Sequence, residues 1–161
     1  DFEIYRDKAH RFILQYPATW SQVPSTHERT RIKIVSENGN GAQDCMVNVQ
    51  IEKRPKSMTP KEFVRSAPTA QEYERILRNA MPNSKVIKRG ETNISNQDAI
   101  YYIVDFTFKS VGIEVPMRSF TIQTIKNEYL YSVACRAEQD EFEKYLTDFQ
   151  IIFAGFLIWP N

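Results

Sequence analysis

Residues 98–137 read DAIYYIVDFTFKSVGIEVPMRSFTIQTIKNEYLYSVACRA, and this stretch decides the fold. At its start every even position from 100 to 108 is apolar, whereas the other face carries the polar side chains of Asp105, Thr107 and Lys109. Alternation with a period of two predicts a strand that turns one face to a core. Two further runs, 118–125 and 129–137, are rich in β-branched and aromatic residues. We expect the three runs to form the middle of one antiparallel sheet.

The second face of the first run is partly apolar as well, because Tyr101 and Ile103 lie on it. A sheet with apolar residues on both faces needs a cover on each of them. The short polar connections Ser110–Gly112 and Lys126–Glu128 suit hairpin turns. Strands that are neighbours in the sequence are therefore expected to be neighbours in the sheet.

Toward the N-terminus, the sequence predicts an opening hairpin formed by residues 2–5 and 11–16. Pro17 ends the second of these strands, and residues 17–20 are expected to turn the chain. Trp20 is large enough to anchor that turn on the core.

A second hairpin is predicted for residues 31–36 and 45–53. The connection Glu37–Gly41 contains an Asn-Gly pair, which favours tight reversal. Gly39 and Gly41 would also suit a phosphate cradle, but no Lys-Ser/Thr pair and no helical pattern follows them. The turn is the preferred interpretation.

Two short helices are predicted in the middle of the chain. Thr59-Pro60-Lys61-Glu62 and Thr69-Ala70-Gln71-Glu72 each place a threonine at the N-cap and a glutamate three residues later. In the second helix one apolar stripe is expected, made of Tyr73, Ile76, Leu77 and Ala80. Residues 85–94 then form a weaker, more polar run that suits an edge strand.

The strongest helical pattern covers residues 138–154, where apolar side chains from Phe142 to Phe153 recur at helical spacing. Acidic residues crowd its first turn, and Gly155 is placed as the residue that follows the helix. The apolar tail 156–159 is too short for a helical pattern. It is expected to add a short strand, to pack on the domain, or to dock on a partner.

These elements predict an α+β protein with a mostly antiparallel sheet of about seven or eight strands, two short helices in mid-chain and one C-terminal helix. We expect residues 1–161 to form a single domain, because the length suits one hydrophobic core. The charges nearly balance, with 21 Lys plus Arg against 20 Asp plus Glu, so total charge offers no argument for nucleic acid. No apolar run approaches the roughly 20 residues that span a bilayer.

The sequence begins at Asp1 rather than Met, which suggests a processed or trimmed form and makes export possible. A periplasmic or otherwise exported location is favoured over a cytoplasmic one. Cys45 and Cys135 both fall on the apolar parity of their strands. Buried free thiols are the preferred interpretation, since cysteine is among the most buried residue types. A disulfide would need Cα atoms within roughly 7 Å, a distance that the sequence does not supply.

Several strings resemble a known family. Residues 12–17 followed by Trp20 look like the "apolar run, Tyr/Phe-Pro, x-x-Trp" signature of PsbP-like domains, and the similarity continues through the Thr59 helix start, residues 99–108 and the final helix. This superfamily includes an extrinsic photosystem II subunit, a Ran-binding protein and bacterial exported proteins. The resemblance implies an α-β-α sandwich and a non-catalytic role in binding or stabilising a protein.

No catalytic, cofactor or metal site is predicted. His10 and His27 both lie in predicted turns, where Asp7 and Glu28 would supply one further ligand each, fewer than a zinc site needs. A Cys-His nucleophile pair would require a cysteine to leave its core face. Asp105 stands out within an apolar strand. A solvated patch or an ion pair, for which Arg118 is the candidate partner, is preferred as the explanation over a catalytic carboxylate.

Basic residues gather in three runs: Arg29, Arg31 and Lys33; Lys53, Arg54 and Lys56; and Lys85, Lys88 and Arg89. Aromatic residues are not interleaved with them, so stacking on single-stranded nucleic acid is poorly supported, and solvated strand ends are the simplest interpretation. The leading hypothesis is therefore a non-enzymatic, exported module that binds an unidentified protein partner, without a cofactor. The alternative is a small-ligand or lipid-binding domain with a pocket between the sheet and the C-terminal helix, and a hydrolase comes third.

Overall fold

The computed structural model describes residues 1–37 and 43–159, which contain three helices and ten strands. The helices are α1 (Pro60–Ser66), α2 (Ala70–Arg78) and α3 (Phe142–Ala154). The strands are β1 (Phe2–Asp7), β2 (Phe12–Pro17), β3 (Trp20–Val23), β4 (Thr30–Ser36), β5 (Asp44–Ile51), β6 (Lys85–Ile94), β7 (Gln97–Ser110), β8 (Ile113–Lys126), β9 (Tyr129–Glu138) and β10 (Phe156–Ile158). The turn expected at Glu37–Gly41, with its glycine pair, lies outside the described residues from position 38 onward.

Seven strands form one antiparallel sheet in the order β3-β4-β5-β9-β8-β7-β6. The three runs of residues 98–137 are β7, β8 and β9, each with a neighbour on both sides, so the prediction of a central trio is confirmed. Strand β6 lies at an edge, as its polar pattern indicated. The α+β class with a mostly antiparallel sheet is confirmed.

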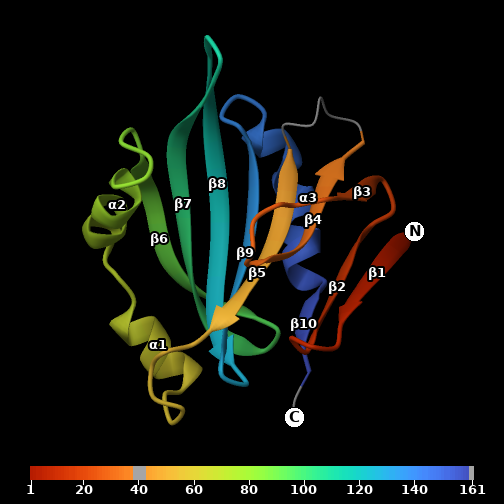
Figure 1. Ribbon diagram of the computed structural model, residues 1–161, viewed down its shortest axis with the longest axis vertical. Coiled ribbons are helices and arrows are strands. Elements are labelled where there is room, and N and C mark those ends of the chain that lie inside the picture. The colour runs from red at the N-terminus through yellow and green to blue at the C-terminus, as the bar shows by residue number, and fades with distance from the viewer. Residues whose placement is uncertain (38–42, 160–161) are drawn as a thin grey trace.

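The two faces of this sheet carry separate cores, and Figure 1 shows α1 and α2 on the left of the sheet, with β1 and β2 on the right. On one face, Ile100, Tyr102 and Val104 of β7 pack with residues of α1 and α2. On the other face, Tyr101 packs against the larger core that holds α3 and β2. The expectation that both faces are covered is therefore confirmed.

The N-terminal hairpin does not join the large sheet. Strands β1 and β2 pair as predicted, but β2 also pairs with β10, giving a separate sheet in the order β1-β2-β10. The apolar tail thus adds a short strand in which Phe156 and Ile158 are buried and Leu157 is exposed. Local patterns did not reveal this pairing, because it joins residues more than 140 positions apart in the chain.

Strand β3 is a second departure from the sequence analysis, which placed a turn at Pro17–Trp20. Trp20 is buried as expected, with its ring 6.3 Å from that of Phe149, but it also begins a strand that pairs with β4. The run is only four residues long and partly polar, so alternation alone could not distinguish it from a loop.

Helices α1 and α2 begin as predicted, with Thr59 and Thr69 as N-caps and a full capping box at Thr69. The predicted apolar stripe of α2 is partly wrong: Tyr73 and Leu77 pack on the core, whereas Ile76 is 56% exposed and Ala80 lies beyond the end of the helix. The reason is position, since α2 lies against the edge strand β6 and overhangs solvent.

Side chains of the sheet donate hydrogen bonds to the backbone carbonyl groups of the link between α1 and α2. Arg89 donates from Nε to the Pro68 carbonyl at 2.8 Å and from Nη2 to the Ala67 carbonyl at 3.2 Å. The Tyr102 hydroxyl donates to the same Pro68 carbonyl at 2.6 Å. The helical layer is therefore held over β6 and β7 by polar contacts as well as by packing.

Helix α3 begins at Phe142 rather than at the predicted residue 138, because β9 continues to Glu138. It ends at Ala154, directly before Gly155, as predicted, but the glycine is needed for space rather than for a left-handed backbone. Its φ is −83°, which any residue can adopt. A Cβ added at this position would lie 2.1 Å from the carbonyl oxygen of Gln15. The Gln15 N–H donates to the Gly155 carbonyl at 2.9 Å, so α3 and β2 meet backbone to backbone.

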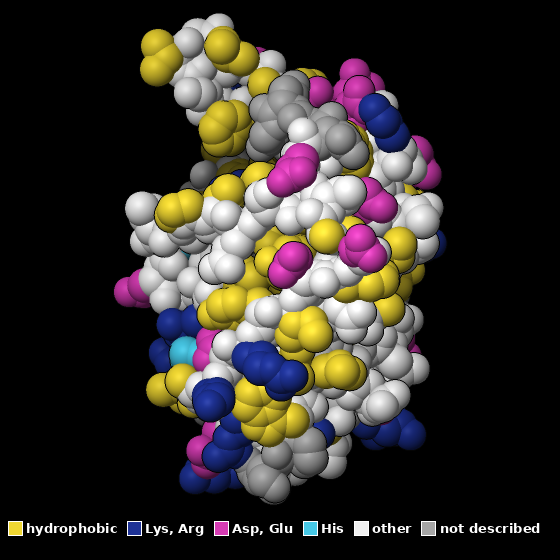
Figure 2. Space-filling model, turned by 90° about the vertical axis from the view of Figure 1, so that its right-hand side faces the viewer, with side chains coloured by type: hydrophobic (Ala, Val, Ile, Leu, Met, Phe, Trp, Pro, Cys, Tyr) yellow, Lys and Arg dark blue, Asp and Glu magenta, His cyan; other side chains and the backbone are white. Residues whose placement is uncertain are grey.

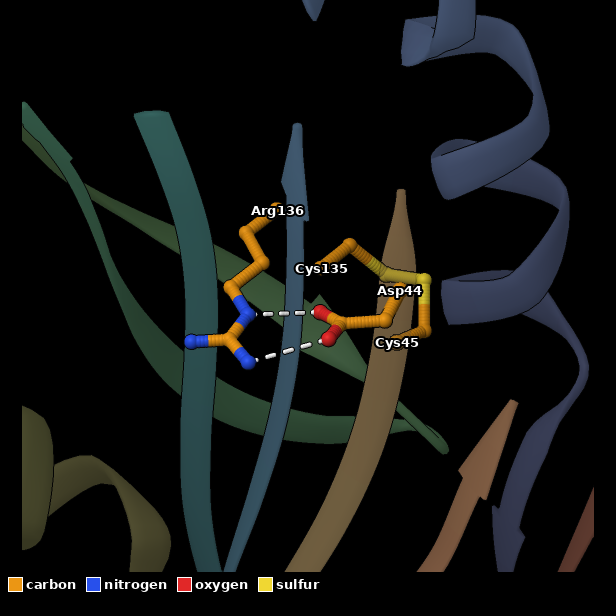
Figure 3. Close-up of a disulfide and its surroundings, with 4 residues drawn as sticks. All are labelled: Asp44, Cys45, Cys135 and Arg136. Carbon is orange, nitrogen blue, oxygen red and sulfur yellow. Dashed lines mark hydrogen bonds and ion pairs between the residues drawn. A yellow bond between two sulfur atoms is a disulfide. The ribbon is translucent and has the colours of Figure 1, made fainter. Parts of the chain in front are cut away.

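Side-chain interactions on both faces of the sheet join strands β5 and β9 (Figure 3). On the α3 side, Cys45 and Cys135 lie directly opposite each other and form a disulfide. On the opposite face, Arg136 donates to the two carboxylate oxygens of the buried Asp44 at 2.7 and 3.0 Å. The preferred sequence interpretation of two free thiols is therefore wrong; both sulfurs are buried, and strand register brings them together.

The hairpin of β7 and β8 extends beyond the rest of the sheet, and its tip is the highest point of Figure 1. Here the apolar face predicted for β7 leaves the core: Phe108 is 51% exposed, and Val111 and Ile113 are exposed as well. None of the helices in the described part of the chain is long and apolar enough to span a bilayer.

Candidate functional site

A groove with a volume of about 580 Å³ lies where β4 begins and β5 ends. Two of the basic runs noted in the sequence meet there. The lining residues are Glu28, Arg29, Arg31, Val49, Gln50, Ile51, Glu52, Lys53, Arg54 and Leu130. We call this surface the basic groove.

Antiparallel pairing of β4 with β5 builds the groove. Thr30 lies opposite Asn48, and the Val49 N–H donates to the Arg29 carbonyl at 3.0 Å, so the start of one strand lies beside the end of the other. A register shift between Thr30 and Ile32 marks a bulge, a feature that bends a strand and re-aims its side chains. The bulge contains Arg31.

The cationic groups of the groove differ in how firmly they are held. Arg54 donates to both carboxylate oxygens of Glu52, at 2.9 and 3.0 Å, and lies over the Phe63 ring. Arg31 donates from Nη2 to the Val49 carbonyl at 3.1 Å. Within the described residues, no carboxylate lies within 4 Å of the charged groups of Arg29, Arg31 or Lys53.

A second, smaller groove of about 280 Å³ neighbours the first, and the two share Ile51, Glu52 and Arg54. It reaches the β8–β9 turn, where Lys56 forms an ion pair with Glu128 at 2.5 Å. The hydrogen bond from Lys56 lowers the pKa of the Glu128 carboxyl. Ile51, which lines both grooves, is an apolar residue that is 73% exposed.

The third basic run has a different environment. Arg89 holds the link between α1 and α2, and the Nζ atom of Lys88 lies 6.0 Å from the centre of the Tyr101 ring. Lys85 is exposed at the start of the edge strand β6. This run therefore does not contribute to the basic groove.

Other candidates from the sequence take structural roles. Asp7 accepts from the His10 backbone N–H at 2.9 Å and contacts the His10 ring nitrogen, closing the β1–β2 turn. His27 is exposed, and its Nδ1 accepts from the Arg29 N–H at 3.2 Å. In the regions that the structure describes, no three His, Cys, Asp or Glu side chains are grouped so that they could hold a metal ion.

Asp105 pairs with Arg118, which was one of the two structural explanations that the sequence offered. Arg118 donates from Nε to Asp105 at 2.7 Å and from Nη2 at 3.0 Å, and its guanidinium lies over the Phe142 ring. The hydrogen bond to Asp105 raises the pKa of Arg118 further above its usual range. The pair links β7, β8 and α3.

The pocket expected between the sheet and the C-terminal helix exists as an open groove of about 390 Å³. Its apolar floor includes Phe120, Ile122 and Phe153, and its rim includes Asn93 and Gln150. The most strongly shifted titratable groups lie elsewhere: burial raises the pKa of both Tyr73 and Tyr131 to about 12. Tyr131 donates its hydroxyl to the His10 carbonyl, which is a structural contact.

Sequence reasoning noted the basic runs but did not bring two of them together. A signal was present, since counting outward from the expected turn at residue 39 places residue 30 opposite residue 48, as the structure has it. Sequence analysis also missed Ile51 as an exposed residue, because its parity in β5 matched the buried Val47 and Val49.

Comparisons with known proteins agree with the fold. The family model described as PsbP matches residues 1–158, and no curated protein matches the sequence. The solution structure of cyanobacterial PsbP (CyanoP) from Synechocystis has a TM-score of 0.72 at 13% identity, covering 98% of this chain and 92% of that one. LpqN of Mycobacterium tuberculosis, described as involved in cell envelope biogenesis, has a TM-score of 0.64 at 12% identity, with coverages of 92% and 83%. The Ran-binding protein Mog1p of Saccharomyces cerevisiae has a TM-score of 0.59 at 8% identity, with coverages of 98% and 95%.

Proposed function

The chain belongs to the PsbP family, and from this premise we propose that it is a single non-enzymatic domain that binds or stabilises a protein partner outside the cytoplasm. The observation that carries the proposal is the basic groove, in which two basic runs and the exposed Ile51 form one surface. Catalysis would need a nucleophile and a base within reach of each other. Here the histidine with the closest carboxylate, His10, closes a turn.

The groove has the mixed character of a protein-binding surface. Interfaces combine an apolar centre with a polar rim, and arginine is enriched in them. Ile51 supplies the apolar centre, and Arg29, Arg31 and Lys53 supply the rim. Among the structural neighbours, Mog1p is described as Ran-binding, which supports a partner-binding role for this fold without identifying the partner here.

Export is supported by the disulfide between Cys45 and Cys135. Disulfides persist in oxidising compartments and are rare where thiols are kept reduced. This bridge joins two central regions of the sheet rather than an exposed loop, so the folded domain contains it as a structural element. The expected location is the periplasm or another exported compartment.

The test is cross-linking of the tagged domain in its native organism, followed by affinity capture and mass spectrometry. We expect one protein or complex to be enriched with the unmodified domain and lost with Arg31→Glu. Lys85→Glu, at the edge strand β6, is the matched control and should retain the partner. Circular dichroism of both variants checks folding. The proposal fails if no protein is enriched, or if both variants lose the same proteins.

A second candidate function is favoured by the groove between the sheet and α3, whose aromatic floor and amide rim suit a small apolar ligand. Native mass spectrometry of the purified domain tests it. A bound small molecule that is lost on Phe120→Asp, together with an absence of cross-linked protein, would favour this function over protein binding.

A further inference from the structure

The proposed protein-binding role leaves open what kind of segment the basic groove receives. Four cationic side chains line it against two carboxylates, although the whole chain carries a net charge of only +1. Glu52 is already engaged by Arg54. Glu28, the other lining carboxylate, lies within 4 Å of no cationic group in the described residues, so the lining keeps an excess of two positive charges, carried by Arg29, Arg31 and Lys53. A concave surface with low-dielectric walls concentrates the potential of such charges.

The distribution of charge over the molecule makes this concentration distinct. Figure 2 shows Lys and Arg side chains mostly over the lower half of the face in view, whereas Asp and Glu gather in its upper half. In Figure 1, β5 ends in the lower half of the molecule, at the groove. On the face in view, charges of opposite sign thus lie apart, although the net charge of the whole chain is near zero.

The shape of the surface selects an extended chain. The groove of about 580 Å³ shares Ile51, Glu52 and Arg54 with the groove of about 280 Å³, so the two neighbouring grooves together offer more room than one side chain requires. A flat bilayer surface does not enter such a recess. A polypeptide in extended conformation does, and its alternate side chains can reach the two sides of the groove.

The apolar side chains in the lining of the basic groove favour an acidic peptide over other anions as its ligand. Ile51, at 73% exposure, and the partly buried Leu130 offer apolar contact between the charged groups. Among the described residues that line the basic groove, none is aromatic, so the stacking surface that single-stranded nucleic acid uses is missing from this lining. Inorganic anions would leave Ile51 without a contact.

We infer that the basic groove binds an extended acidic segment of the partner, whose carboxylates contact Arg29, Arg31 and Lys53 and whose apolar side chain packs on Ile51. This inference rests on the proposed protein-binding function and names the chemistry of the partner. Arginine forks bind carboxylates in a bidentate manner, and Arg31 retains guanidinium donors beyond the one bound to Val49.

The experiment is selection of a phage-displayed random dodecapeptide library on the immobilised full chain. Binding peptides are then synthesised and measured by fluorescence anisotropy. The test variant is Arg29→Glu combined with Lys53→Glu, because both side chains are exposed and neither has an ion-pair partner in the described part of the chain. The matched control is Lys85→Glu combined with Lys88→Glu, which changes the net charge equally at the other side of the sheet.

We expect enriched peptides to contain several Asp or Glu residues with at least one large apolar residue. The test variant should bind them at least about tenfold more weakly, the control within about twofold of the unmodified chain, and Ile51→Ser about threefold more weakly. Raising the salt concentration from about 50 to about 300 mM should also weaken binding, because exposed charges are screened.

The inference is overturned if no peptide is enriched, if enriched peptides lack acidic residues, or if the test and control variants lose equal affinity. Tighter binding to phosphatidylglycerol vesicles, lost in the test variant, would overturn it in favour of a lipid surface. Salt-sensitive self-association, lost in the test variant, would overturn it in favour of a second copy docking its acidic end. If the test variant still cross-links to the partner, the protein-binding function is retained, but the basic groove is excluded as the site that binds the partner.

Discussion

Removing the disulfide by the double substitution Cys45→Ala and Cys135→Ala is expected to cost this domain much of its stability. The two cysteines are 90 residues apart in the sequence. In the chain-entropy account, cross-linking a loop of that length removes about 4.6 kcal/mol of conformational entropy from the unfolded state at 25 °C. Both side chains are buried, so the smaller alanines also lose packing contacts.

The expected loss in the free energy of unfolding is about 3–5 kcal/mol, against a total of roughly 5–15 kcal/mol for a typical domain. Urea unfolding followed by tryptophan fluorescence measures it, because Trp20 is buried in the same core. The m-value should rise in the double variant, since an unfolded chain without the bridge is more expanded. The unmodified protein unfolded in reductant serves as the control and should match the variant.

A loss smaller than about 1 kcal/mol, or an unchanged m-value, would refute this reasoning. It would mean that the register of β5 and β9 is held by the surrounding sheet and by the Asp44–Arg136 ion pair alone. Such a result would also remove the main support for export of the protein, because a disulfide that does not stabilise the fold gives no reason to expect an oxidising compartment.

Three other substitutions or conditions test the structure further. Gly155→Ala should lower the free energy of unfolding, measured in urea, by about 1–3 kcal/mol, because the new Cβ meets the Gln15 carbonyl. Gly112→Ala is the control: Gly112 has a φ of +75° and no atom within 4 Å of the new Cβ, so this substitution should cost only about 1 kcal/mol. A larger cost at Gly112 than at Gly155 would contradict this account. Thr69→Ala should cost about 1 kcal/mol by removing the capping box, and an unchanged melting temperature would argue against it. Burial raises the pKa of Tyr131 to about 12, above the value near 10 of an unfolded tyrosine. The contribution of Tyr131 to the free energy of unfolding should therefore be fully present below pH 10 and be lost as the pH rises from 10 to 12. Tyr131→Phe, which keeps the ring and removes the titrating hydroxyl, should show a shallower fall in the free energy of unfolding over this range.

Local patterns in the sequence determined the secondary structure of most of this chain. Alternation in residues 98–137 identified three central strands, and two Thr-x-x-Glu strings located the starts of α1 and α2. These features depend on residues a few positions apart, so the sequence displays them directly. The ion pair of Asp105 with Arg118 was one of two explanations that the sequence offered, because β7 and β8 are joined by a short turn that limits their register.

Contacts between distant segments could not be predicted in this way. The disulfide depends on the exact register of β5 against β9, and β10 finds β2 across almost the whole chain. A shift of one residue would turn Cys45 to the opposite face, and nothing near Cys45 in the sequence specifies which register is adopted. The exposure of Ile76 likewise follows from where α2 lies on the sheet.

The sequence by itself therefore determined most of the helices and strands, the order of the central strands and the family to which the fold is similar. Only the tertiary structure decided that two basic runs, separated by about 20 residues, form one groove beside an exposed isoleucine. The physical reason is that secondary structure is set by interactions within a few residues, whereas a binding surface is set by packing and strand register, which no short segment encodes.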